Sequence, residues 1–318
     1  MSPRILASLL CIALSLQASA QVDVSESRKA AELHARVGAS PLLPFQRVPC
    51  AAQSPATAWE SGMVSWVAVD STGIIYEIQR GDKADPVLVL NRDGKILRSW
   101  GKGEYTIPHS IRIDPAGNIW TVDAASSTVI EYSALGKKLM TISVGGQPEN
   151  GSPFHGTTDI AFAPNGHLYI TDGYGNARVL EYTADGKQVK QWGRPGTSPG
   201  EFNLPHAIQI DRDGTIYIAD RENGRIQKFN LDGKFLGQIT GLGRVFSLKL
   251  AGGVLWATIQ PFNQPLTSGG WIVKLDRKTG QIFGHLSIPE RGGHSVDLMP
   301  TGEPLTTAGS QLLCFQAK

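Results

Sequence analysis

One pattern of hydrophobic and polar positions recurs six times from residue 60 onward. Each copy holds an alternating apolar segment, a turn that ends in glycine and a second apolar segment, as in residues 67–76 (VAVDSTGIIY). Alternation with a period of two predicts β-strands, and the glycine predicts a tight turn between them. The last two copies are degraded, but the turn glycines still recur every 39 to 49 residues, at Gly73, Gly117, Gly166, Gly214, Gly253 and Gly302.

Two more strands are expected after each copy, such as residues 129–132 (VIEY) and 188–192 (QVKQW). Repeats of this length built from short strands predict a β-propeller. The fold class is therefore all-β, with six blades of four antiparallel strands. After Gly302 the chain has room for only one more strand, Gln311 to Phe315. Because an open sheet edge invites aggregation, we expect Leu42 to Val48 to supply the missing outer strand and close the ring.

The start of the chain has the pattern of an export signal. Arg4 precedes an apolar run over residues 5–16, and Ala18-Ser19-Ala20 is a small-residue cleavage site. The run is too short to span a bilayer, so residues 1–20 predict a signal peptide and a protein exported to the periplasm or beyond the cell. Residues 21–40 are a polar N-terminal tail with a short helix expected around residues 27–36. Residues 41–318 are expected to form the single propeller domain.

Charge and cysteine content narrow the class of protein. The formal net charge is only +2, and the basic residues form no patch or run, which argues against nucleic-acid binding and a polybasic membrane surface. Removal of the signal would leave Cys50 and Cys314. In an oxidising compartment they could form a disulfide, which the expected ring closure favours; two buried thiols are the alternative.

Three histidines occupy equivalent positions in alternate repeats. His109, His206 and His294 each lie eight residues before a turn glycine, in the second, fourth and sixth units. Alternate units of a six-membered ring lie a third of a turn apart, so the three imidazoles are expected to meet on the ring axis. Three neutral imidazoles with an open fourth position are a catalytic zinc arrangement. A single histidine at such a position would more simply bind its neighbours by hydrogen bonds.

Polar side chains from neighbouring loops are expected on the same face. Arg80 and Arg221 both follow their turn glycine by seven residues, in opposite units, and Tyr174 lies in the matching loop of the third unit. Two guanidinium groups and a phenol predict an anion-binding pocket. The alternative is that the arginines pair with Asp172 and Asp220 at nearby strand ends.

These segments resemble a known family. Residues 220–229 (DRENGRIQKF) and 172–178 (DGYGNAR) resemble NHL-repeat propellers, and the Pro-His pairs together with Arg80, Tyr174 and Arg221 more closely resemble the peptidyl-α-hydroxyglycine α-amidating lyases. The resemblance implies a catalytic zinc on the three histidines, a substrate carboxylate held by the two arginines, and Tyr174 as the base. It thereby implies a small-molecule or peptide substrate with a C-terminal carboxylate.

The resemblance also implies a structural calcium ion in the channel. Its expected ligands are the backbone carbonyls of Val67 and Ile111 and an aspartate directly after the third histidine, where this chain has Ser295. Loss of the only carboxylate weakens a site for a hard cation.

Three functions are compatible with the sequence. The first is an exported zinc lyase that cleaves a carbinolamide to an amide and glyoxylate. The second is a non-catalytic NHL propeller that binds a protein or another ligand on its top face. The third, a calcium-dependent lactonase-like hydrolase, is disfavoured because such propellers use acidic ligands where this chain has histidines.

Overall fold

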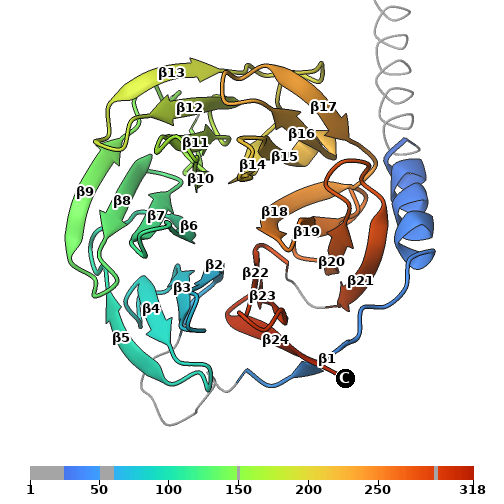
Figure 1. Ribbon diagram of the computed structural model, residues 1–318, viewed down its shortest axis with the longest axis horizontal. Helices are drawn as coiled ribbons and strands as arrows, with labels where there is room; N and C mark the ends of the chain where they lie inside the picture. The colour runs from blue at the N-terminus through green and yellow to red at the C-terminus, as the bar shows by residue number, and fades with distance from the viewer. Residues whose placement is uncertain (1–24, 51–60, 149–150, 290–292) are drawn as a thin grey trace, which may run out of the picture.

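The computed structural model describes residues 25–50, 61–148, 151–289 and 293–318. Its strands form six four-stranded antiparallel sheets arranged as blades around a central axis (Figure 1). The predicted all-β, six-bladed propeller is confirmed. Each blade runs from an innermost strand at the axis to an outermost strand at the rim.

Blades one to five each use four consecutive strands. Blade one holds β2 (Val64–Val69), β3 (Ile75–Gln79), β4 (Val87–Leu90) and β5 (Ile96–Trp100), and blade two holds β6 (Pro108–Ile113), β7 (Ile119–Asp123), β8 (Thr128–Tyr132) and β9 (Lys138–Ser143). Blade three holds β10 (Asp159–Phe162), β11 (Leu168–Asp172), β12 (Arg178–Tyr182) and β13 (Gln188–Trp192), and blade four holds β14 (Pro205–Ile210), β15 (Ile216–Asp220), β16 (Arg225–Phe229) and β17 (Phe235–Ile239). Blade five holds β18 (Arg244–Ala251), β19 (Val254–Gln260), β20 (Gly270–Leu275) and β21 (Ile282–Ile288).

Blade six joins the two ends of the chain. It holds β22 (Val296–Leu298), β23 (Pro304–Ala308), β24 (Gln311–Ala317) and, as its outermost strand, β1 (Phe45–Val48), which pairs with β24. The closing strand is therefore where the sequence placed it, although it begins three residues later, because Leu42 forms a bridge with His285 of blade five. A disulfide joins Cys50 to Cys314 beside the last pair of this ladder.

The inner and outer strands of the blades differ in how far they are buried. The inner strand β2 is buried at every position because neighbouring blades cover both of its faces, whereas the outer strand β13 is mostly exposed. The aromatic residues of the second strands pack between blades and are at most 4% exposed, at Tyr76, Trp120, Tyr169, Tyr217 and Trp256. The repeated glycine turn thus connects two strands that build the core.

The N-terminal tail forms a helix over residues 25–38, longer than the expected one, which lies against the rim beside β21 (Figure 1). Leu33 and Val37 are buried on the core, and Arg36 donates hydrogen bonds to the carbonyls of Thr240 and Gly280 at 2.7 and 2.5 Å. The helix therefore connects blades four and five. Among the described residues, no helix is long and apolar enough to cross a membrane.

Candidate metal centre

The three histidines lie at the start of the inner strands, where they are not paired in the strand ladder. The register of β6 against β7 shifts at His109, and that of β14 against β15 shifts at His206. Such a bulge leaves one residue unpaired and redirects its side chain. His294 lies just before β22 begins. Local irregularity at the start of the inner strand is what turns each imidazole toward the axis.

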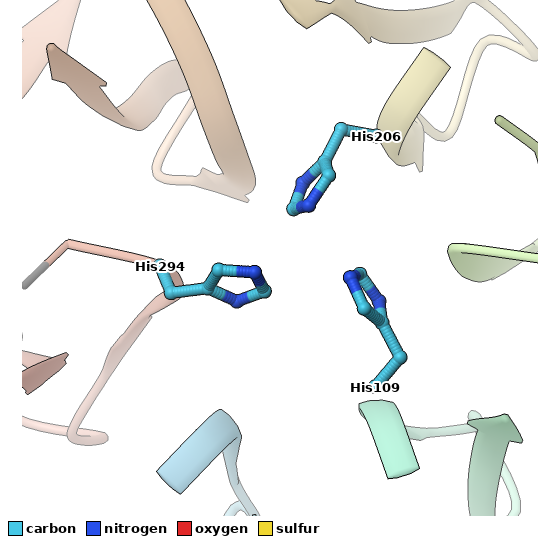
Figure 2. A group of neighbouring side chains, drawn as sticks. All are labelled: His109, His206 and His294. Carbon is cyan, nitrogen blue, oxygen red and sulfur yellow. The ribbon is translucent and has the colours of Figure 1, made fainter. Parts of the chain in front are cut away.

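The three imidazoles converge on one point (Figure 2). Their candidate ligand atoms all lie within 4.8 Å of one another, and the ring centroids are 4.8 to 5.1 Å apart. His109 and His206 are fully buried. The convergence expected from alternate blades of a closed ring is present, and the three residues could hold a metal ion.

Each imidazole is oriented by the next blade. The Nδ1 atoms of His109, His206 and His294 lie 2.6, 2.6 and 2.7 Å from the carbonyl oxygens of Thr158, Phe246 and Ser65, which occupy the matching positions of blades three, five and one. A carbonyl only accepts, so Nδ1 carries the proton and Nε2 keeps its lone pair. Backbone carbonyls often orient metal-binding histidines in this way.

The environment keeps two of these imidazoles neutral. Burial lowers the pKa of His109 well below its usual value, and the neighbouring His294 and Arg80 lower it further. Burial also lowers the pKa of His206, followed by the effects of Arg221 and the other two histidines. Neutral imidazole is the form that binds zinc, so these donors fit the ion named by the resemblance.

Trp66 packs against all three histidines. Its ring centroid lies 5.7 to 6.1 Å from theirs, and it is completely buried. Trp66 was not predicted as a site residue, although the sequence contains a signal for it. The residues that follow the histidine position in the other blades are all small or short, namely Ser110, Asp159, Ala207, Ser247 and Ser295. Trp66 is therefore the one large side chain at this position among the six blades, and it packs against the three histidines.

The residues around Trp66 fit the expected calcium ion poorly. The guanidinium of Arg112 lies 4.9 Å from the Trp66 ring and forms a buried ion pair with Asp159. Ser295 Oγ, at the position of the expected carboxylate, accepts a hydrogen bond from the N–H of Val67 at 3.0 Å. Because the Asp159 carboxylate is already paired with Arg112 and Ser295 carries no charge, the carbonyls of Val67 and Ile111 would have little help in binding a hard cation.

The three loop residues meet at the histidines. Arg80, Tyr174, Arg221 and His294 line one cavity of about 440 Å³. Tyr174 Oη lies 3.0 Å from Nε2 of His109 and 3.3 Å from Nε2 of His206. The phenol is therefore at the point where the imidazoles present their lone pairs.

The arginines do not pair with the strand-end carboxylates. Asp172 and Asp220 instead bind Arg178 and Arg225, both within 2.8 Å. Arg80 donates to Ser65 Oγ at 2.8 Å, and Arg221 donates through Nε to Glu222 at 2.8 Å. The alternative interpretation of these arginines is wrong, and both guanidinium groups remain at the cavity.

A strained backbone precedes His206. Leu204 has a φ of +65°, a left-handed conformation that is uncommon for a residue with a bulky side chain. Its carbonyl accepts the backbone N–H of Arg221 at 3.1 Å, and its side chain lines the cavity. Such strain persists only where the surroundings enforce it, and it is concentrated at functional sites. No sequence pattern indicated it.

The fold and the site define a six-bladed β-propeller with a histidine cluster at its axis. The family DUF5128, described as a 6-bladed beta-propeller, matches residues 153–297. The chain also resembles the virginiamycin B lyase structure from Staphylococcus aureus with a TM-score of 0.57, over 83% of this chain and 81% of that chain, at 19% identity. That likeness concerns the fold alone.

The curated relatives have three kinds of name: amidating monooxygenase, amidating lyase and NHL repeat-containing protein. Peptidyl-glycine alpha-amidating monooxygenase A from Xenopus laevis is 33% identical over 64% of this chain and 26% of its own length. A probable peptidyl-alpha-hydroxyglycine alpha-amidating lyase from Caenorhabditis elegans is 29% identical over 60% of this chain and 65% of its length. NHL repeat-containing protein 3 from Mus musculus is 34% identical over 56% of this chain and 55% of its length.

The resemblance to NHL propellers and amidating lyases is confirmed by these matches. The chain spans about a quarter of the length of the amidating monooxygenases. Activities named for the relatives therefore reach this chain only as a proposal.

Proposed function

We propose that the protein is an exported, zinc-dependent lyase that cleaves the C–N bond of a carbinolamide to give an amide and glyoxylate. The observation that supports this most is a cluster of three convergent imidazoles, one of which lines a cavity together with a phenol and two guanidinium groups. The amidating-lyase names of the relatives support the choice of reaction. The signal-like pattern of residues 1–20 supports export.

The histidines are proposed to hold the ion through Nε2, since Nδ1 of each is engaged by a backbone carbonyl. A bound zinc ion would supply Lewis-acid chemistry that lowers the pKa of a hydroxyl group. Three protein ligands leave the fourth position to the substrate. Trp66 packs against the rings and keeps their spacing fixed.

The other residues bind the substrate and move its proton. Arg80 and Arg221 would hold the carboxylate of R–CO–NH–CH(OH)–COO⁻, because guanidinium groups match carboxylate geometry. Tyr174 is the base in this proposal: in its phenolate form it accepts the hydroxyl proton and becomes a phenol. As the C–O bond gains double-bond character, the C–N bond breaks and its electron pair goes to nitrogen, which receives a proton. The products are R–CO–NH₂ and glyoxylate, with no other reactant required.

The direct test uses α-hydroxyhippurate and measures glyoxylate and benzamide. We expect equimolar products from the wild-type protein and loss of activity by at least about a hundredfold in a His109→Ala/His206→Ala variant. His167→Ala is the control, because His167 pairs with Glu181 on blade three, outside the cavity. Absence of glyoxylate from the wild type, or full activity in the double variant, would reject the lyase.

The second candidate is a non-catalytic propeller that binds a ligand or protein. The match to NHL repeat-containing protein 3 favours it, since that name specifies a repeat and no reaction. It predicts a folded protein that retains metal and releases no glyoxylate from any carbinolamide. The same assay therefore separates the two functions.

A further inference from the structure

We infer that the cavity selects substrates whose acyl group is aromatic or bulky and aliphatic, and that Leu266 sets this preference. The inference rests on the proposed function, because it names the part of the carbinolamide that lies beyond the carboxylate. Neither the histidines nor the two arginines explain a preference for one acyl group over another.

One side of the cavity is built for an anion. Arg221 is only 7% exposed, and its Nε is occupied by Glu222, which also binds Nε of Arg244 at 3.0 Å. The Arg221 guanidinium therefore lies fixed at the cavity wall. The described residues that line the cavity include two arginines and no carboxylate, so a cationic ligand group has no partner there.

The guanidinium groups are flanked by apolar surface. The Arg80 guanidinium carbon lies 5.3 Å from the centre of the Phe154 ring, and that of Arg221 lies 5.3 Å from the Phe246 ring. Both phenylalanines line the cavity. An anion bound by these arginines therefore has apolar walls on either side, which favours a ligand whose charged group is attached to an apolar one.

Leu266 extends this apolar surface. It lines the cavity although its residue surface is 52% exposed. Its loop is held in place, because Gln260 Nε2 donates to the carbonyls of Pro265 and Ser268 at 3.0 and 2.8 Å, and Arg244 donates to that of Gln264 at 3.0 Å. Leu266 therefore adds a large apolar side chain, on a fixed loop, to the cavity wall that already includes Phe154 and Phe246.

The cavity size agrees with this assignment. About 440 Å³ is in the range of small-ligand sites. A ring on the acyl carbon would reach apolar surface that a methyl group leaves exposed to water, and burial of apolar area is the source of the preference. Recognition therefore has two parts, the carboxylate at the arginines and the acyl group at the Leu266 side.

Binding measurements test the inference without requiring turnover. Hippurate and N-acetylglycine share the amide and carboxylate and differ in having a phenyl or a methyl group. We expect calorimetry to show that wild-type protein binds hippurate about tenfold more tightly than N-acetylglycine. Leu266→Ser should weaken hippurate about fivefold and leave N-acetylglycine unchanged. Leu236→Ser is the matched control, because Leu236 is 53% exposed on the outer strand β17.

The outcomes separate the two proposals. Equal affinity for the two ligands, no binding of either, or the same loss in Leu236→Ser as in Leu266→Ser would overturn the inference. A preference for hippurate that falls from about tenfold to about twofold in Leu266→Ser supports it. If that preference is present but α-hydroxyhippurate yields no glyoxylate, the proposed lyase function is rejected. The inference that the cavity binds a carboxylate attached to an apolar group is then still supported.

Discussion

At the scale of single residues, Tyr174 contacts two of the three histidines directly. Its hydroxyl group lies within hydrogen-bond distance of the Nε2 atoms of two histidines, His109 and His206. Because these nitrogens carry lone pairs, the phenol donates its proton toward them. An ion held by these two Nε2 atoms would lie beside Tyr174 Oη, which is why we assign this group the proton transfer from the substrate hydroxyl.

Tyr174→Phe removes only that hydroxyl group. We expect kcat for glyoxylate release to fall by about 10²- to 10⁴-fold, the usual contribution of a general base, while zinc content stays unchanged. Stopped assays with α-hydroxyhippurate and metal analysis of the same preparation measure both. Tyr182→Phe, in the core between blades two and three, is the control. Unchanged kcat in Tyr174→Phe would exclude the tyrosine as the base.

The residues of the site were predictable in part. The spacing of His109, His206 and His294 was sufficient to place them, because equivalent positions of a closed ring must meet at its axis. Glu222 and Leu204 were not predictable in this way. Their roles depend on one ion pair and one backbone angle, and neither leaves a periodic signal in the sequence.

At the scale of elements, β3 contains an unusual buried acid. Glu77 lies in a strand that is buried throughout. Its Oε1 accepts a long hydrogen bond of 3.3 Å from the hydroxyl group of Ser61, which offsets little of the cost of burying the charge. Burial raises the pKa of Glu77 to about 7. The folded protein therefore binds a proton that the unfolded chain releases at lower pH.

Glu77→Gln should remove a pH dependence of stability. With a raised pKa in the folded state, the contribution of the wild-type acid is complete below about pH 4.5 and is lost as the pH rises through about 7. The loss is on the order of 3 kcal/mol. Denaturant unfolding at pH 5 and pH 8 should show a larger decrease for wild type than for Glu77→Gln. Equal decreases would contradict the assignment; Glu32→Gln, on the exposed helix surface, is the control.

The strand bulges show the limit of pattern-based prediction for elements. Alternation predicted the inner strand of the second repeat without indicating how its ladder begins. The structure has a register shift at residues 108–110, since His109 must turn out of the ladder to reach the axis. A period-two pattern carries no sign of such an extra residue.

At the scale of the whole molecule, ring closure is the dominant feature. Blade six takes three strands from the C-terminus and one from the N-terminal segment, and the disulfide joins residues 264 positions apart. This closure was predictable because the repeat count left one strand missing. The contact of the N-terminal helix with blades four and five was not, because it depends on Arg36 reaching backbone carbonyls, which have no sequence signature.

The double variant Cys50→Ser/Cys314→Ser should lower the free energy of unfolding by about 2–5 kcal/mol. The crosslink limits the unfolded chain and holds β1 against β24. Denaturant unfolding of oxidised wild type and the variant measures the difference. Unaltered stability would show that strand pairing alone closes the ring.

The central claim is that the three converging histidines form a metal site. Metal analysis of purified protein, beside the His109→Ala/His206→Ala variant, tests it most directly. The account predicts about one zinc ion per chain in the wild type and none above background in the variant, since one remaining imidazole does not hold the ion. A metal-free wild-type protein that stays metal-free when supplied with zinc, or a variant that keeps its full zinc content, would contradict it.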